Sequence, residues 1–240
     1  VGIRESMGSI VALFKSTPAV VLIQEAKLPP SAVANLKRVA HKLLPHYCLF
    51  MGTLPKDGPS SQRHEVVTFV HCHLAARATL LDITRQTMDV TAASRSELLS
   101  KTQVLRTTDV QSQVNILWLN IYGFQASDPT RQEAHWNLIH SVVTRWQPQS
   151  DYVIIGGDFN ASLTRRFGYN PDSKVHCADA LARRFTQQLS LSVSAPSLPT
   201  WSNVEGSKAS TLDFFLSKAI TQRDGPHIMA TCLSTVSGSE

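Results

Sequence analysis

The segment that most constrains the fold is 152–155, an apolar run of Tyr-Val-Ile-Ile followed at once by Gly156-Gly157-Asp158-Phe159-Asn160. A short apolar run bounded by glycines is typical of a strand buried on both faces. The two glycines allow another backbone to approach closely. If the strand geometry continues, the period of two places Asp158 and Asn160 on one side and turns Phe159 into the core. The alternative is a strand-ending turn in which Asp158 and Asn160 cap their own backbone.

A second buried strand is predicted at 19–23, and it delivers Glu25 beyond its carboxyl end. A carboxylate directly after a buried strand indicates that it faces a cleft. Pro29-Pro30 then breaks the chain, and Ser31 is expected to cap a helix that runs to about Leu44. The predicted apolar stripe of this helix consists of Val33, Leu36, Val39, Ala40 and Leu43.

The rest of the chain mixes short strands with helices. Helices are predicted within residues 1–17, where Pro18 ends the pattern, from Asp128-Pro129 to Trp146, and near residues 177–189. Strands are predicted at 47–51, 66–74, 102–106, 115–121, 212–216 and 228–233. With 240 residues, 42% of them apolar, one sizeable core is expected. We therefore predict a single α/β domain over 1–240, a two-sheet β-sandwich flanked by helices.

The bulk properties narrow the function only slightly. A net charge of +5 and a pI of about 9.2 favour association with polyanions, although such a charge does not by itself select nucleic acid. No apolar run is long enough to span a membrane and no secretory signal is visible, so we expect an intracellular protein with no membrane partner. The cysteines contain no CxxC pair, which predicts reduced, mostly buried thiols at Cys48, Cys72, Cys177 and Cys232.

Four segments accompany Gly157-Asp158-Phe159-Asn160 along the chain: Val21-Leu22-Ile23-Gln24-Glu25, Leu119-Asn120-Ile121-Tyr122, Pro199-Thr200-Trp201 and Ser210-Thr211-Leu212-Asp213. In order and approximate spacing these resemble the motifs of the endonuclease/exonuclease/phosphatase superfamily, and most nearly its branch in LINE-type (non-LTR) retrotransposons. The resemblance covers nearly the whole chain. It implies a DNase I-like sandwich with four layers, α/β/β/α.

The resemblance also implies a role for each matching residue. Glu25 would bind the divalent metal, normally Mg²⁺, with Mn²⁺ as a substitute. Asp158 would orient or deprotonate the attacking water, and Asn160 would hold the scissile phosphate. Tyr122 would contact the phosphate or the leaving group, and Asp213 would support the metal-bound network. The expected substrate contacts are Asn120, Gln125, Thr200 and Ser210.

The chain departs from the family pattern in three places. The family's first strand carries a metal-holding Asn, and this chain starts after it. The family's last motif is Ser-Asp-His, whereas the chain ends at Ser239-Glu240, so Glu240 would stand for the Asp beside the metal and the His is absent. The tripeptide Ala-Pro-Asn reads Gly123-Phe124-Gln125, so Gln125 only partly replaces a phosphate-contacting amide. We expect the first and final strands to be missing and the chain to be weak or inactive by itself.

Other polar groups have both a functional and a structural interpretation. His71-Cys72-His73 would suit zinc, but no second ligand pair lies nearby in sequence, so alternating exposed histidines are favoured. Arg165-Arg166 follows the Gly-Asp-Phe-Asn loop and would reach a phosphodiester backbone, or else belongs to a solvated loop. Arg183-Arg184 and Lys37-Arg38 are interpreted as polar helix faces.

The leading hypothesis is a metal-dependent phosphodiesterase, a DNA endonuclease that nicks target DNA in the nucleus as part of a retrotransposon protein with a downstream reverse transcriptase. One alternative is another phosphoesterase of the superfamily, such as an abasic-site nuclease, a deadenylase or a lipid or inositol phosphatase. The other is a mobile-element remnant that no longer catalyses. These enzymes share one phosphate site and differ in the surrounding loops, so the motifs do not separate them.

Overall fold

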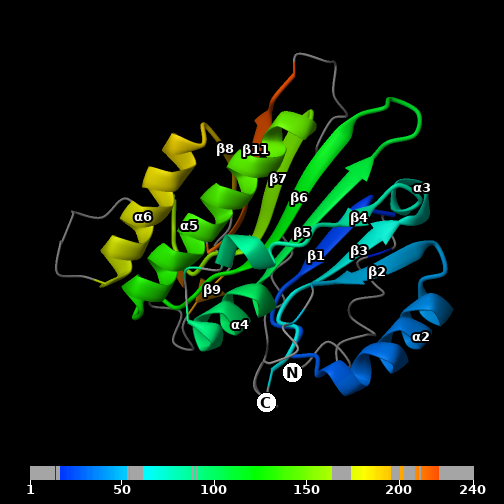
Figure 1. The fold of residues 1–240 in the computed structure, drawn as a ribbon, viewed down its shortest axis with the longest axis horizontal. Coiled ribbons are helices and arrows are strands. Elements are labelled where there is room, and N and C mark those ends of the chain that lie inside the picture. The colour runs from blue at the N-terminus through cyan, green and yellow to red at the C-terminus, as the bar shows by residue number, and fades with distance from the viewer. Residues whose placement is uncertain are drawn as a thin grey trace.

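The strands form two main sheets, as predicted (Figure 1). The computed structural model describes residues 14, 17–52, 54, 62–87, 89, 91–163, 174–195, 201–202, 209–210 and 212–221. The three-stranded sheet has the order β1-β3-β2, with the bounds Val20–Ile23, Val67–His71 and Tyr47–Met51. The six-stranded sheet has the order β4-β5-β6-β7-β11-β8, with the bounds Thr79–Leu80, Thr102–Thr108, Asn115–Tyr122, Tyr152–Asp158, Asp213–Ala219 and Ser192–Ser194. Strands β9 and β10 form a separate antiparallel pair, Trp201–Ser202 with Ala209–Ser210.

Helices cover the outer face of each sheet. Figure 1 shows α5 and α6 on one side of the molecule and α2 on the other, with both sheets between them. Their bounds are Pro129–Trp146, Lys174–Gln188 and Val33–Leu43. The predicted four-layer α/β/β/α sandwich is therefore confirmed. The shorter helices are η2, α3, η3, α4 and η4, at Pro30–Ala32, Cys72–Ala75, Thr84–Thr87, Ala92–Ser100 and Gln147–Gln149.

Side chains of β6 alternate between the two sides of the six-stranded sheet. Leu117, Leu119 and Ile121 belong to the main core, together with the buried residues of α5 and α6. Trp118 instead packs in a cluster with residues of the small sheet. Because the strand period is two, Asn120 and Tyr122 follow Trp118 on the face between the sheets. This alternation brings polar side chains into the inter-sheet layer at one end of β6.

Asn120 joins the two sheets through a buried hydrogen-bond network. Only 1% of Asn120 is exposed. Its Nδ2 donates to the carbonyl oxygen of Val67 at 2.9 Å and to Thr68 Oγ1 at 3.1 Å, both on β3. Its Oδ1 accepts from Gln24 Nε2 at 2.6 Å. Since buried amides require partners, this network fixes the alignment of β1 and β3 against β6.

Replacing Asn120 should loosen the contact between the sheets. We expect Asn120→Ala to lower the free energy of unfolding by about 2–3 kcal/mol, because it leaves buried partners unsatisfied on the opposing sheet. Urea denaturation measures this loss. Asn115→Ala is the matched control, since Asn115 pairs with Thr108 at the partly buried start of the same strand. Equal losses for the two variants would contradict an inter-sheet role for Asn120.

The helix after β1 starts differently from the prediction. Ser31 lies within η2, so the N-cap of α2 is Ala32, which makes no side-chain cap bond. Leu43, expected in the apolar stripe, is 46% exposed, because the stripe ends at Ala40 and Leu44. By contrast, the predicted Asp-Pro start of α5 is confirmed: Asp128 Oδ1 accepts from the backbone N–H of Arg131 at 3.1 Å.

Several predicted boundaries also need correction. The strand expected at 66–74 ends at His71, because Cys72–Ala75 turns into α3. The strand at 19–23 is only partly buried, since β1 pairs with β3 alone among the described strands. Cys48 and Cys72 are exposed and Cys177 is partly exposed, so the expectation of mostly buried thiols is wrong for these three residues. The predictions for residues 1–13 and 228–233 lie outside the described residues. No helix in the described ranges is long and apolar enough to cross a membrane.

Candidate active site

Three motif residues lie side by side at one end of the six-stranded sheet. Strand β7 runs parallel to β6, with Asp158 opposite Tyr122. It runs antiparallel to β11, with Asp158 opposite Asp213. All three side chains are neither fully buried nor fully exposed. The register thus brings together Tyr122, Asp158 and Asp213, as the sequence predicts from their positions at strand ends.

Glu25 reaches the same place from the small sheet. It follows β1 with a φ of 52°, a left-handed conformation that turns the chain away from the strand. The hydroxyl of Tyr122 donates to Glu25 Oε1 at 2.7 Å, and Lys27 Nζ lies 3.4 Å from Glu25 Oε2. The hydrogen bond from Tyr122, aided by Lys27, lowers the pKa of Glu25, which remains an ionised carboxylate. Burial and the same hydrogen bond raise the pKa of Tyr122, which remains a donor.

Asp158 has the opposite electrostatic character. Burial, followed by repulsion from Asp213, raises the pKa of Asp158 to about 7. Its Oδ1 accepts from the backbone N–H of Asn160 at 2.9 Å, which partly offsets the increase. A carboxylate whose pKa lies near neutrality is suited to accept and release a proton.

The turn after β7 shows what the Gly-Asp-Phe-Asn sequence does. The strand geometry ends at Asp158, and Asn160 adopts a left-handed conformation with a φ of 49°. Phe159 enters the core as predicted, where it stacks on Trp136 and Phe214 at centroid distances of 5.4 and 4.2 Å. Asn160 Nδ2 donates to the carbonyl oxygen of Gly123 at 2.9 Å. Phe159 therefore takes its predicted core position, and the backbone-capping alternative holds for Asp158 but not for the side chain of Asn160.

The glycines of this region allow backbones to approach closely. A Cβ on Gly123 would lie 2.4 Å from the carbonyl oxygen of Phe159. The N–H of Gly123 donates to the carbonyl oxygen of Asp158 at 2.6 Å, so the ends of β6 and β7 are held together beyond the strands. Gly157 has a φ of 150° and faces the backbone of Ile121 in the same way. The close approach positions Tyr122 beside Asp158.

Two residues outside the motifs also lie near the site: Lys101 beside the Tyr122 ring, and the buried His135 beside the Phe124 ring. Lys101 Nζ lies 3.7 Å above the centre of the Tyr122 ring. Next to Lys101 in the chain, Thr102 Oγ1 lies 2.7 Å from Nε2 of the buried His135. Burial, and then the charge of Lys101, lower the pKa of His135 to about 3, so the imidazole is neutral. In the sequence, Lys101 is distinguished only by its position directly before the strand predicted at 102–106.

The remaining predicted contacts divide into four groups. Asn120 has its amide engaged between the sheets, so it positions Gln24 beside Glu25 instead of pointing outward. Gln125 is exposed on the turn that follows β6. The backbone of Ser210 lies in β10, and its side chain is not described. The expected contacts Arg165, Arg166 and Thr200 and the expected metal ligand Glu240 lie outside the described residues.

The donor chemistry at Glu25 fits a hard divalent cation. Magnesium prefers oxygen ligands and is usually held by one or two carboxylates, with waters and substrate phosphates as the other ligands. The side chain of Glu25 is 52% exposed, which leaves room for such ligands. In the part of the chain that is described, no three His, Cys, Asp or Glu side chains form a closed metal cage. His71 and His73, whose Nδ1 atoms lie 2.5 Å apart, form only a pair.

Residues 4–230 match the family model described as Endonuclease/Exonuclease/phosphatase family. The chain belongs to this family. The matched segment includes both Glu25 and Asp213. Membership assigns the chain to a family of phosphoester hydrolases. No curated protein sequence matched the chain.

Solved structures show the family fold at low sequence identity. The AP endonuclease from Leishmania major is 14% identical, with a TM-score of 0.61, over 90% of this chain and 74% of that one. The endonuclease domain of TRAS1, a telomere-specific non-LTR retrotransposon, is 20% identical, with a TM-score of 0.54, over 87% and 77%. The 3′ phosphatase NExo from Neisseria, solved with a product DNA hairpin, is 14% identical, with a TM-score of 0.59, over 90% and 82%.

Proposed function

We propose that this family member is a metal-dependent DNA endonuclease that nicks target DNA in the nucleus as part of a retrotransposon protein with a downstream reverse transcriptase. The observation that carries the proposal is the meeting of Glu25 and Tyr122 from opposite sheets, next to the Asp158–Asp213 pair. The likeness to the TRAS1 endonuclease domain, whose identity exceeds that of the other two structures named above, supports the retrotransposon context.

The side chains divide the chemistry of phosphodiester hydrolysis among them. Asp158, with its pKa near neutrality, accepts the proton of the attacking water. Asn160 retains a second amide hydrogen beyond the one given to Gly123, and it holds the scissile phosphate. Tyr122 orients Glu25 through its hydroxyl. Mg²⁺ held by Glu25, or Mn²⁺ in its place, would polarise the phosphate when bound.

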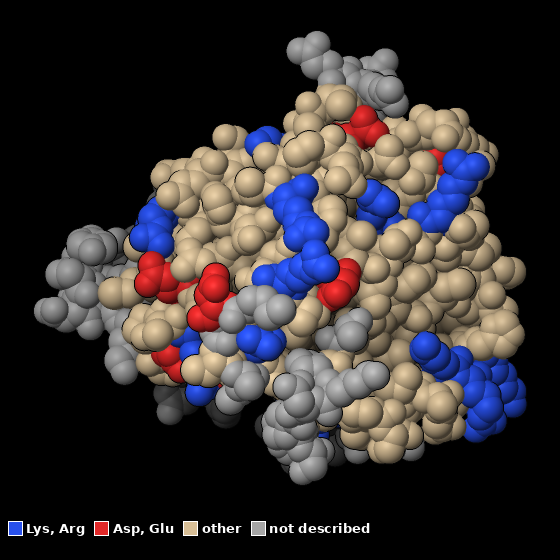
Figure 2. Space-filling model, viewed as in Figure 1, with Lys and Arg blue, Asp and Glu red and all other residues tan. Residues whose placement is uncertain are grey.

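The charged side chains on the surface favour an anionic substrate, although the surface is not uniformly basic. Figure 2 shows basic side chains gathered over α2, where Lys37, Arg38 and Lys42 lie, while basic and acidic side chains are interspersed over much of the same face. The interpretation of Lys37 and Arg38 as a polar helix face agrees with their exposure. Individual cations near the site therefore matter more for phosphate binding than the net charge of +5.

Nicking of supercoiled plasmid by the full-length protein in Mg²⁺ tests the proposal. We expect relaxed circles from the wild type, and about 10²-fold less product from Asp158→Ala and from Glu25→Gln. Glu25→Gln should also remove the response to added Mg²⁺. Glu133→Gln, at an exposed acid of α5 paired with Arg184, is the control and should nick normally. Equal nicking by wild type and Asp158→Ala would refute the endonuclease proposal.

A further inference from the structure

Lys101 is held in place from both of its ends. It lies between α4 and β5, and its carbonyl oxygen accepts from the backbone N–H of Tyr122 at 2.9 Å. At the other end, its Nζ lies 3.7 Å from the centre of the Tyr122 ring and 5.2 Å from that of Phe124. A cation over two aromatic faces keeps a fixed position without using its N–H donors. Lys101 is thus a positioned charge directly beside the site.

The ammonium group of Lys101 is surrounded by acids but is not paired with them. Glu65, Glu97, Asp158 and Glu25 all act on Lys101 through their charge, while burial outweighs them and lowers the pKa of its side chain. No hydrogen bond or ion pair of Nζ is found among the described residues. An ammonium group has three donors, so those of Lys101 are open to a ligand.

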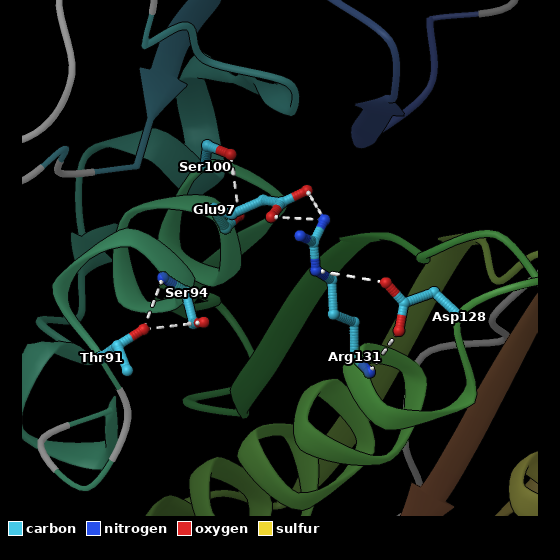
Figure 3. Close-up of polar contacts among 6 residues, drawn as sticks. All are labelled: Thr91, Ser94, Glu97, Ser100, Asp128 and Arg131. Carbon is cyan, nitrogen blue, oxygen red and sulfur yellow. Dashed lines mark hydrogen bonds and ion pairs between the residues drawn. The ribbon is translucent and has the colours of Figure 1, made fainter.

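Glu97, one of the acids that act on Lys101 through their charge, is paired with another cation. Figure 3 shows Arg131 between Glu97 and Asp128. Its Nη1 lies 3.0 Å from Glu97 Oε2, and its Nε lies 3.2 Å from Asp128 Oδ2. Glu97 therefore has a partner on α5, four positions before Lys101 in the chain. Lys27 is likewise paired with Glu25, whereas Lys101 Nζ lies over the Tyr122 ring.

We propose that Lys101 binds a backbone phosphate of DNA beside the scissile bond, with its ammonium group held over the Tyr122 ring. The inference rests on the proposed function, because it concerns the same site. A site built from Glu25, Asp158 and Asp213 repels a phosphodiester, and a fixed cation at its edge reduces this repulsion. The ammonium group already lies against the rings of Tyr122 and Phe124, so little side-chain freedom is lost on binding.

Salt-dependent binding of a short fluorescent duplex DNA tests the role of Lys101. It is measured in EDTA on the full-length protein carrying Asp158→Asn, so that no strand is cut. We expect Lys101→Met to weaken binding about ten-fold. The negative slope of log K against log salt should become shallower by about 0.9, the value for one phosphate. Lys101→Arg should keep the slope. Lys218→Met is the control, because it removes the same charge at the opposite end of β11.

The outcomes separate this inference from the endonuclease proposal. If Lys101→Met binds like Lys218→Met, with an unchanged slope, the phosphate contact is wrong even when the wild type nicks plasmid. If the wild type does not nick but the slope falls only in Lys101→Met, the phosphate contact stands and the endonuclease proposal fails. A general folding defect would change affinity without changing the slope. Should Lys101→Met not fold, Lys101→Gln is measured in its place, with the same expected result.

Discussion

Asp158→Asn should unfold at a higher urea concentration than the wild type at pH 8, while losing about 10²-fold or more in nicking rate. Both effects come from one carboxylate. At pH 8 the wild type carries a largely buried charge that faces Asp213, and the amide removes this repulsion. The amide oxygen still accepts from the N–H of Asn160, so the turn keeps its geometry. Activity and stability should therefore move in opposite directions, as for a site selected for its chemistry.

The stability difference should depend on pH in a defined direction. The pKa of Asp158 is raised from an ordinary 3.8 to about 7 in the folded protein. Stability from this group is therefore complete below pH 4 and is lost as the pH rises through 7. Each pKa unit corresponds to about 1.4 kcal/mol, and since Asp158 is partly open to solvent we expect a gain of about 2 kcal/mol above pH 7.

Urea denaturation of both proteins in EDTA between pH 4 and pH 8 measures this dependence. The two curves should coincide near pH 4 and separate as the pH rises. Asp213→Asn is a second variant that should recover part of the gain, because it removes the second cause of the raised pKa. If Asp158→Asn were less stable than the wild type at pH 8, or if the difference in stability did not change with pH, folding would not raise the pKa of Asp158.

Gly157→Ala should cost the protein several kcal/mol of stability, enough to prevent folding in a marginally stable domain. A Cβ at this position would lie 1.9 Å from the carbonyl oxygen of Ile121, and the φ of 150° is one that L side chains rarely adopt. The obstacle is backbone, and it is paired in register with β7, so it has no room to move.

Thermal unfolding and the yield of soluble protein measure the effect. Gly52→Ala is the matched control, because its added Cβ would lie at an ordinary 3.4 Å from the carbonyl oxygen of Thr102. We expect this control to stay within about 1 kcal/mol of the wild type. If Gly157→Ala were equally well tolerated, the close contact between β6 and β7 would not be required by the fold.

The sequence predicts the sandwich because its signals are local. An apolar strand followed by glycines and an acid, or an Asp-Pro helix start, depends only on near neighbours in the chain. Such signals place Glu25, Asp158 and Asp213 at strand ends, and their meeting then follows from the order of the strands. Ser31 shows the limit of a local signal: it is a good cap residue, but the chain makes a 3₁₀ turn first and moves the helix start to Val33.

Contacts between distant segments are what the sequence does not predict. Asn120 was expected to touch substrate, yet its partners Val67 and Thr68 belong to the opposing sheet, far away in the chain. Lys101 carries no motif at all, and its place over Tyr122 becomes visible only when β5 is paired with β6. The charge of Asp158 likewise depends on Asp213, a cross-strand neighbour.

Because the site is divided between two sheets, the ribosome synthesises its residues at different times. The described strands of the small sheet, which carries Glu25, are fully synthesised at His71, whereas Asp213 lies in β11, the last strand of the described residues. Chains are synthesised at about 5–20 residues per second and tend to fold from the amino terminus. The small sheet is therefore present for several seconds before the six-stranded sheet is complete. Throughout that interval the nascent protein lacks Asp213, so the site proposed for phosphodiester hydrolysis is incomplete until β11 has been made.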